Sequence, residues 1–228
     1  MLKINNLSVF MDNKKVLDNI SCSIPAGSIV VLLGKSGAGK TTFLRSIAGL
    51  NESKKGTILL NNKAIQQKDI GFVPQGFALF PQLTVLEQCT HPLTKTRNML
   101  PAIADKKALD LLTQLQINEF KNALPHQLSG GQQQRTAIAR GLCIEPKILL
   151  LDEPNSALDP QNTEILIKLL FEYAKNGNII ICSTQDIDLA AKIATRCLFF
   201  DNGCTSEEIT VSDKNDFLEK ISLFFEKN

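Results

Sequence analysis

Eight consecutive residues near the N-terminus have the types and spacing of a phosphate-binding loop. They are Gly34, Lys35, Ser36, Gly37, Ala38, Gly39, Lys40 and Thr41, which match G-x-x-x-x-G-K-[ST] at every fixed position. Glycines let backbone N–H groups curl around phosphate oxygens, and the start of a helix adds partial positive charge. Lys40 can supply a cation to the β- and γ-phosphates, and Thr41 a hydroxyl to Mg²⁺. The pattern predicts ATP binding with Mg²⁺; the alternative is a glycine-rich turn with a chance lysine.

Two carboxylates follow an apolar run much further along the chain. Residues 148–151 are apolar and predict a buried strand, and Asp152 and Glu153 come directly after it. Ligands of open α/β sheets bind at the carboxyl ends of the strands. Asp152 is placed to hold Mg²⁺ through water, and Glu153, pointing elsewhere, could polarise an attacking water. The alternative is a solvated acidic turn.

A glycine-containing segment, Leu128 to Arg135, is the third candidate. Its Ser129 and Gln132 fit an S-x-x-Q capping box, which is a purely structural explanation. Capping does not explain Gly130 and Gly131, because glycines inside the first turn weaken a helix. Close approach of a ligand would explain them, and both roles can hold together.

The spacing of apolar residues predicts the strands and helices that position these residues. Strands are predicted at 29–33, 56–60, 70–74, 148–151 and 179–182, and helices at 41–50 and 164–174. Such alternation argues for an α/β fold with a parallel sheet. Looser alternation between Leu7 and Ile24 predicts short antiparallel strands, and a helical pattern from 81 to about 140 predicts an insertion. A final amphipathic helix, packed on the protein's own surface, is predicted from Phe217, Leu218, Ile221, Phe224 and Phe225.

Composition narrows the function classes. The 228 residues suit one domain, or one with an inserted subdomain, and the net charge of +2 comes from 25 basic and 23 acidic residues. No run of like charge indicates a nucleic-acid partner. No apolar run is long enough to span a bilayer. The six cysteines include no C-x-x-C pair, and a reduced, intracellular protein is expected.

Taken in order, the motifs resemble those of the nucleotide-binding subunit of an ABC transporter. The phosphate loop is followed by Gln75 in a matching Q-loop, by LSGGQ at 128–132, by LLLDEP at 149–154 and by a D-loop at 156–159. The resemblance covers nearly all of the chain. It implies one ATPase domain with a P-loop NTPase (RecA-like) parallel-sheet core at about 1–80 and 141–228. An N-terminal antiparallel β subdomain and an inserted α-helical subdomain at 81–140 complete the expected α/β fold.

The resemblance also implies a mechanism in which two such domains dimerise head to tail around two ATP molecules. In each site, Lys40, Thr41, Thr42 and Asp152 would act in cis, and the partner would contribute Ser129, Gly130, Gly131 and Gln132. Glu153 would be the catalytic base, Thr41, Gln75 and Asp152 would serve the metal, and Asp159 would lie at the dimer contact. Gln75 would also link the metal site to the helical subdomain, which docks on membrane partners.

The implied partners are a second ATPase subunit (a homodimer is expected), transmembrane permease subunits and a substrate-binding protein, with no nucleic acid. The expected location is peripheral, on the cytoplasmic face of the cell membrane. Residues 77–81 with 84–87, and the stretch LSGGQQQR-x-AIAR, are similar to a narrower branch, the importers of polar amino acids. This similarity predicts an importer of that class.

Two positions depart from the family's pattern. Gln185 stands where the family usually has a histidine after the last core strand; its amide can donate to a γ-phosphate, but it cannot carry a positive charge or relay a proton. Near the start, the family places an aromatic residue against adenine, and Phe10 and Met11 are the candidates. Neighbouring strand residues face opposite sides, so only one of the two can stack. Phe10 could instead belong to the strand core.

Two other functions stay open from the sequence. One is a non-transport ABC ATPase of translation or DNA repair, although the chain has no room for tandem ATPase domains or a long coiled coil. The other is a nucleotide-binding ABC module with slow or regulatory hydrolysis, which Gln185 keeps open.

Overall fold

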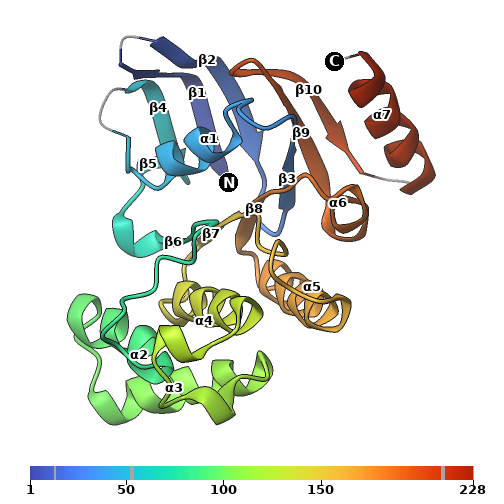
Figure 1. Cartoon of the computed structure of the whole chain (residues 1–228). Coiled ribbons are helices and arrows are strands. Elements are labelled where there is room, and N and C mark those ends of the chain that lie inside the picture. The colour runs from blue at the N-terminus through green and yellow to red at the C-terminus, as the bar shows by residue number, and fades with distance from the viewer. Residues whose placement is uncertain (13, 52–53, 212–213, 228) are drawn as a thin grey trace. The chain divides into compact units, whose positions relative to one another are not determined.

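The computed structural model describes the chain except for residues 13, 52–53, 212–213 and 228, and it does not describe the side chains of 206, 214–216 and 225–227. The chain forms two compact units (Figure 1): Met1–Gln67 with Leu170–Asn228, and Lys68–Leu169. No helix in the described part of the chain has the length and apolar character needed to cross a bilayer.

An antiparallel sheet begins the first unit, as the loose alternation at the N-terminus predicts. Its order is β2-β1-β4-β5, built from β1 (Leu2–Met11), β2 (Lys14–Ile24), β4 (Lys54–Leu60) and β5 (Lys63–Ala64). Both long strands bury every apolar residue of one face, including Leu7 and Ile20, which are paired across the sheet. The opposite face carries lysines, serines and asparagines, so the sheet is covered on one side only.

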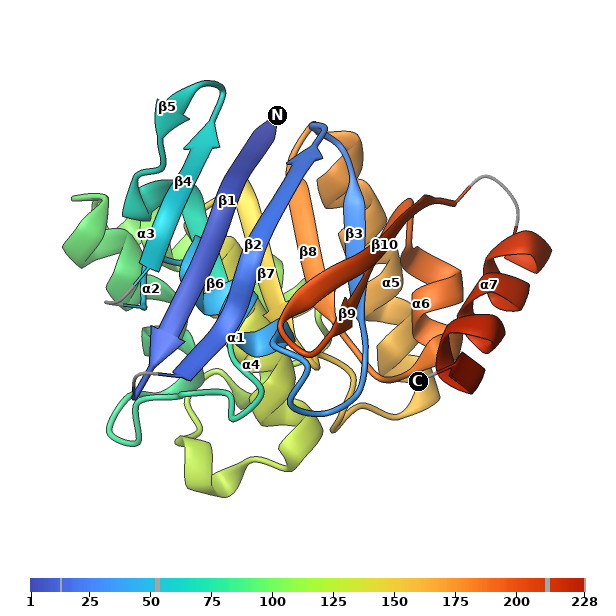
Figure 2. The same cartoon turned by 90° about the horizontal axis from the view of Figure 1, so that it is seen from above.

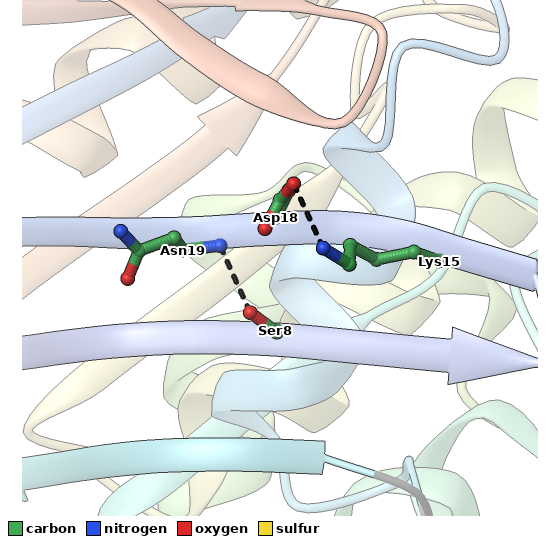
Figure 3. A network of polar contacts seen from close by, with 4 residues as sticks. All are labelled: Ser8, Lys15, Asp18 and Asn19. Atoms are coloured by element: carbon green, nitrogen blue, oxygen red, sulfur yellow. Dashed lines mark hydrogen bonds and ion pairs between the residues drawn. The ribbon is translucent and has the colours of Figure 1, made fainter.

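The pairing of β1 with β2 is interrupted by left-handed residues rather than being regular. Asn6 and Asn19 have φ values of 51° and 50°, a region that asparagine tolerates better than most residues. The backbone N–H of Asn19 donates to the hydroxyl of Ser8 at 2.9 Å, and that of Asn6 to Ser21 at 2.8 Å. Side chains therefore replace the missing ladder bonds, as Figure 3 shows for Ser8 and Asn19.

The same unit holds the strands around which the phosphate loop is built (Figure 2). They run in the order β10-β9-β3-β8: β3 (Ile29–Leu33), β8 (Ile179–Ser183), β9 (Arg196–Asp201) and β10 (Cys204–Thr210). The strand β3 is parallel to both β8 and β9, and every residue of β3 and β8 is buried. Continuous apolar runs are what strands buried on both faces require, so the predicted parallel core is confirmed.

Three helices complete this unit together with the end of α5 (Pro160–Lys175): α1 (Lys40–Ile47), α6 (Ile187–Ile193) and α7 (Lys214–Lys227). The predicted surface packing of the last helix is confirmed by buried Phe217, Ile221 and Phe224, and the Phe224 ring lies 4.6 Å from that of Phe199 on β9. The side chain of Phe225 lies outside the described residues.

The predicted helix over 41–50 is three residues too long at its end. Gly49 is left-handed (φ 73°), its N–H donates to Ser46 O, and the N–H of Leu50 donates to Arg45 O. These two bonds form a Schellman motif, which ends α1 at Ile47.

The second unit contains the predicted helical segment and two more parallel strands, β6 (Ile70–Val73) and β7 (Ile148–Asp152). Its helices are α2 (Val85–Thr96), α3 (Pro101–Gln114) and α4 (Gly130–Cys143), with short 3₁₀ turns at Asn118–Phe120 and Pro125–Gln127. The helix α2 starts at a complete Thr84–Glu87 capping box. Ala108 and Leu112 of α3 and Ile138 of α4 are fully buried, so the helical pattern reflects a packed core.

Phe43 fixes α1 to the parallel sheet. Its side chain is fully buried and its ring centroid lies 5.2 Å from that of Phe200 on β9. We expect Phe43→Ala to lower the free energy of unfolding by about 3–5 kcal/mol, through lost transfer energy and the cavity left behind. Phe171→Ala is the matched control, because Phe171 is 43% exposed. Equal urea midpoints for the two variants would contradict this role of Phe43.

Candidate nucleotide-binding site

The phosphate loop joins the end of β3 to the start of α1. Gly39, directly before the helix, has φ 107°, a conformation that residues with a Cβ rarely adopt. The first turn of α1 has no acidic residue, and its N-cap residue, Gly39, has no side chain with which to cap it. Backbone N–H groups at a helix N-terminus bind anions when nothing else satisfies them. The local backbone is therefore arranged for a phosphate.

Lys40, the lysine of the G-x-x-x-x-G-K-[ST] pattern, is folded inward. Its ammonium donates to the carbonyl oxygens of Gly34 at 2.6 Å and Lys35 at 3.0 Å, and its side chain is only 6% exposed. Main-chain carbonyls are neutral acceptors, and phosphate oxygens form stronger, charge-assisted hydrogen bonds with an ammonium. The lysine is thus held at the loop, where a polyphosphate can take over its hydrogen bonds.

The back of the loop is tied to a hairpin that sequence reasoning missed. The carbonyl of Ala38 accepts from the N–H of Gly203 at 3.1 Å, and the carbonyl of Gly203 accepts from Asp18 N–H at 2.9 Å. Asn202 and Gly203 form the tight turn between β9 and β10, with φ values of 46° and 79°. An Asn-Gly pair is a strong hairpin signal, which could have located this turn from the sequence, although not its contact with Ala38.

Gln185 follows β8, the strand that pairs with β3. Both strands run parallel, so the phosphate loop and Gln185 leave the sheet at the same edge. Its neighbours are fixed: Thr184 Oγ1 accepts from the N–H of Asp186 at 3.0 Å, and Asp186 Oδ1 caps α6 by accepting from Leu189 N–H at 2.9 Å. Gln185 itself is exposed. The first unit therefore brings Gln185 to the edge that carries the phosphate loop.

The second unit brings Gln75 and Asp152 to one edge in the same way. They follow or end β6 and β7, which are parallel, with Val73 opposite Leu151. Asp152 is the buried last residue of β7, and Gln75 is exposed. Glu153 is half-buried and left-handed (φ 52°), so the chain turns away from the strand direction at this residue. A non-glycine residue here is strained, which is common at functional sites.

The capping box predicted for the LSGGQ segment is present at the start of α4. Ser129 Oγ accepts from Gln132 N–H at 3.3 Å, and Gln132 Oε1 accepts from Ser129 N–H at 2.8 Å, which completes the capping box. Gly131 also has a reason within the chain, because a Cβ there would lie 3.0 Å from the carbonyl oxygen of Ala157. The D-loop backbone passes this turn so closely that a side chain would press against it.

Asp159 has a capping role that the sequence did not reveal. Its carboxylate accepts from Asn162 N–H at 2.8 Å and Asn162 Nδ2 at 2.6 Å at the start of α5. These hydrogen bonds hold the pKa of Asp159 below its usual value, and nearby Arg135 adds to the effect. Arg135 in turn donates to the carbonyls of Leu115 and Gln116 at 3.1 and 3.3 Å. The helix α4, which begins in the LSGGQ segment, and the D-loop are therefore linked by Arg135, to which the sequence analysis gave no role.

The two adenine candidates lie at the end of β1. Val9, not Phe10, is the buried core residue there. Phe10 is half-buried with the ammonium of Lys55 5.5 Å from its ring centroid, and Met11 is 42% exposed. The Lys55 ammonium thus lies against the ring of Phe10, whereas Met11 is open to solvent.

Comparison with known proteins identifies the family of this chain. Residues 17–156 match the family described as ABC transporter. The glutamate transport ATP-binding protein GluA of Corynebacterium glutamicum is 38% identical over 97% of this chain and 99% of that protein. The arginine transport ATP-binding protein ArtM of Bacillus subtilis is 38% identical over 97% and 100%, respectively. The glutamate/aspartate import ATP-binding protein GltL of Escherichia coli is 35% identical over 96% and 93%.

Solved structures show the same fold. The dimeric bacterial ABC transporter cassette MJ0796 superposes with a TM-score of 0.86, at 33% identity over 93% of this chain and all of that one. Its post-hydrolysis state, bound to ADP and Pi, gives a TM-score of 0.83 at the same identity. The expected P-loop NTPase fold and ATP-binding activity are confirmed, and the chain belongs to the ABC transporter family as an ATP-hydrolysing subunit.

Proposed function

We propose that this chain hydrolyses ATP to drive an importer of polar amino acids, at the cytoplasmic face of a cell membrane. Relatives of nearly the same length are named for transport of glutamate, arginine and aspartate. The observation that carries the proposal is one chain holding both a phosphate loop and an intact LSGGQ segment at a capped helix start. Permease subunits and a substrate-binding protein are the proposed partners.

The catalytic unit proposed is a head-to-tail dimer of this chain, in keeping with the dimeric MJ0796 cassette. Ser129 and Gly130 are exposed at the N-terminus of α4, where the helix dipole favours negative charge. They, with Gly131 and Gln132, would contact the γ-phosphate held by the partner's phosphate loop. Asp159 would lie near this contact, and ATP would close the interface.

Within one copy, the proposed ligands of ATP are Lys40, Thr41 and Thr42. Thr41, Gln75 and Asp152 offer a hydroxyl, an amide carbonyl and a carboxylate, which are the hard oxygen donors that suit Mg²⁺. When bound, the metal would neutralise charge on the phosphates. Glu153 would accept a proton from the attacking water, and exposed Met11, rather than lysine-covered Phe10, would contact adenine.

Glu153→Gln tests the proposed base. The amide keeps the shape of the carboxylate but cannot accept a proton, so kcat should fall ~10²–10⁴-fold while ATP affinity is kept. Phosphate release measures kcat, and equilibrium binding measures affinity. The control is Glu172→Gln, on the exposed surface of α5. Near-normal turnover by the Glu153 variant would remove it from this role.

Variants of Gln185 test whether its hydrogen bond to the γ-phosphate limits kcat. A charged donor is worth about 1 kcal/mol more than a neutral one, so Gln185→His should raise kcat ~5-fold. Gln185→Leu removes the donor and should lower kcat. An unchanged rate in the histidine variant would show that this position does not limit hydrolysis.

The transport role is tested on the assembled complex. Co-purification with a membrane permease and phosphate release stimulated by glutamate or arginine in proteoliposomes are expected. Co-purification with ribosomes or DNA instead would support a non-transport ABC ATPase. A complex that binds ATP but releases no phosphate would support a regulatory module.

A further inference from the structure

The loop that carries Gln75 has an unusual backbone directly after that residue. Phe77 and Ala78 are both left-handed, with φ values of 59° and 49°. Two consecutive non-glycine residues in this region are strained, and a bulky one is especially unfavourable. Two local bonds accompany it: Phe77 N–H donates to Pro74 O at 3.1 Å, and Ala78 N–H donates to Gly76 O at 2.6 Å, a γ-turn centred on Phe77. Such a turn is itself strained, so contacts from elsewhere in the unit would help to keep it.

Arg140, near the end of α4, makes the contacts that hold it. One guanidinium nitrogen donates to Ala78 O at 2.6 Å and the other to Phe77 O at 2.9 Å. The guanidinium also lies 5.9 Å from the ring centroid of Phe80, within the range of a cation–π interaction. Both left-handed residues therefore present their carbonyls to the same planar fork.

Holding a loop with the Arg140 guanidinium costs desolvation free energy, which suggests that Arg140 has a role beyond packing. Burial lowers its pKa, and no carboxylate among the described residues forms an ion pair with it. A half-buried cation that is paired only with neutral carbonyls and a ring keeps part of its desolvation cost. A loop needing attachment alone could use neutral donors.

Gln88 of α2 fixes the other end of the same segment. Its amide accepts from Phe80 N–H at 3.1 Å and donates to Phe80 O at 2.6 Å and Leu83 O at 3.2 Å. This side chain is 1% exposed. Residues 77–80 are thus attached at both ends to helices of the same unit.

We propose that Arg140 is a positioning residue for ATP hydrolysis. By binding the carbonyls of Phe77 and Ala78, it fixes the position and orientation of Gln75. The helix α4 starts at the LSGGQ segment and bears Arg140 in its last turn. The γ-phosphate contact and the Gln75 loop are therefore joined through one rigid helix, and a movement of either shifts the other. The proposal rests on the proposed role of Gln75 at the metal.

Arg140→Lys tests this, because an ammonium is a point charge that cannot hold two carbonyls in a fixed fork. The full chain should bind ATP within about 3-fold of wild type, while kcat falls by roughly 10-fold or more without a rise in KM. Chymotrypsin should cut faster after Phe77, because the loop is loosened; the bond after Phe80 precedes Pro81 and is not a site for this protease. Arg97→Lys is the matched control, since Arg97 donates to Lys68 O and Ile144 O, both at 2.7 Å, in the same unit away from this loop.

A double-mutant cycle separates positioning from stability. If Arg140 acts through Gln75, then Arg140→Lys should change kcat by less than about 2-fold in a Gln75→Ala background. Undiminished loss there would overturn the proposal, as would kcat and cleavage rates equal to those of Arg97→Lys. If Gln75→Ala alone leaves kcat unchanged, the proposed metal role fails, while the cleavage rates still decide whether Arg140 holds the loop.

A second variant covers the case in which Arg140→Lys does not fold. Phe80→Ala removes the ring from beside the guanidinium, and Phe80 is 47% exposed, so folding should be retained. Cleavage after Phe77 should rise and kcat should fall by about 2-fold or more. No change in either quantity would overturn the proposal.

Discussion

In each of the two units, a positively charged side chain that donates to main-chain carbonyls orders a loop carrying proposed site residues. Lys40 donates to Gly34 and Lys35 in the phosphate loop, and Arg140 to Phe77 and Ala78 in the Gln75 loop. Neutral carbonyls only partly compensate a desolvated cation. Each loop is therefore ordered by hydrogen bonds from a charged side chain to carbonyl oxygens. An anion that replaced a carbonyl would form a stronger hydrogen bond with the cation, and a movement of the loop would weaken the existing ones.

Strained backbone marks the ends of strands that carry proposed chemistry. Glu153 is left-handed directly after β7, and Phe77 and Ala78 follow β6 by a few residues. In each case the chain must leave the sheet edge in a direction that an extended backbone does not provide. This backbone strain occurs where parallel strands bring the residues that follow them to a common edge, and ligands of α/β folds bind at such edges.

The LSGGQ segment shows how one sequence satisfies two constraints. Ser129 and Gln132 cap α4, while Gly131 makes room for the carbonyl of Ala157 in the D-loop. Arg135, one turn on, adds an electrostatic link to Asp159. The structural explanation is compatible with the proposed functional one, because Ser129 and Gly130 are exposed and leave the N-terminus of α4 accessible to an anion.

The sequence by itself determined the phosphate loop, the acidic strand end, the capping box and the alternation of strands with helices, because each depends on local spacing. It could not place the end of α1, where a Schellman motif at Gly49 decided the boundary, nor the Gly203 tether of Ala38. It also left Phe10 between core and ligand, and it gave Arg140 and Gln88 no role. Those assignments depend on which distant backbone carbonyls and rings a side chain meets, and only tertiary packing decides that.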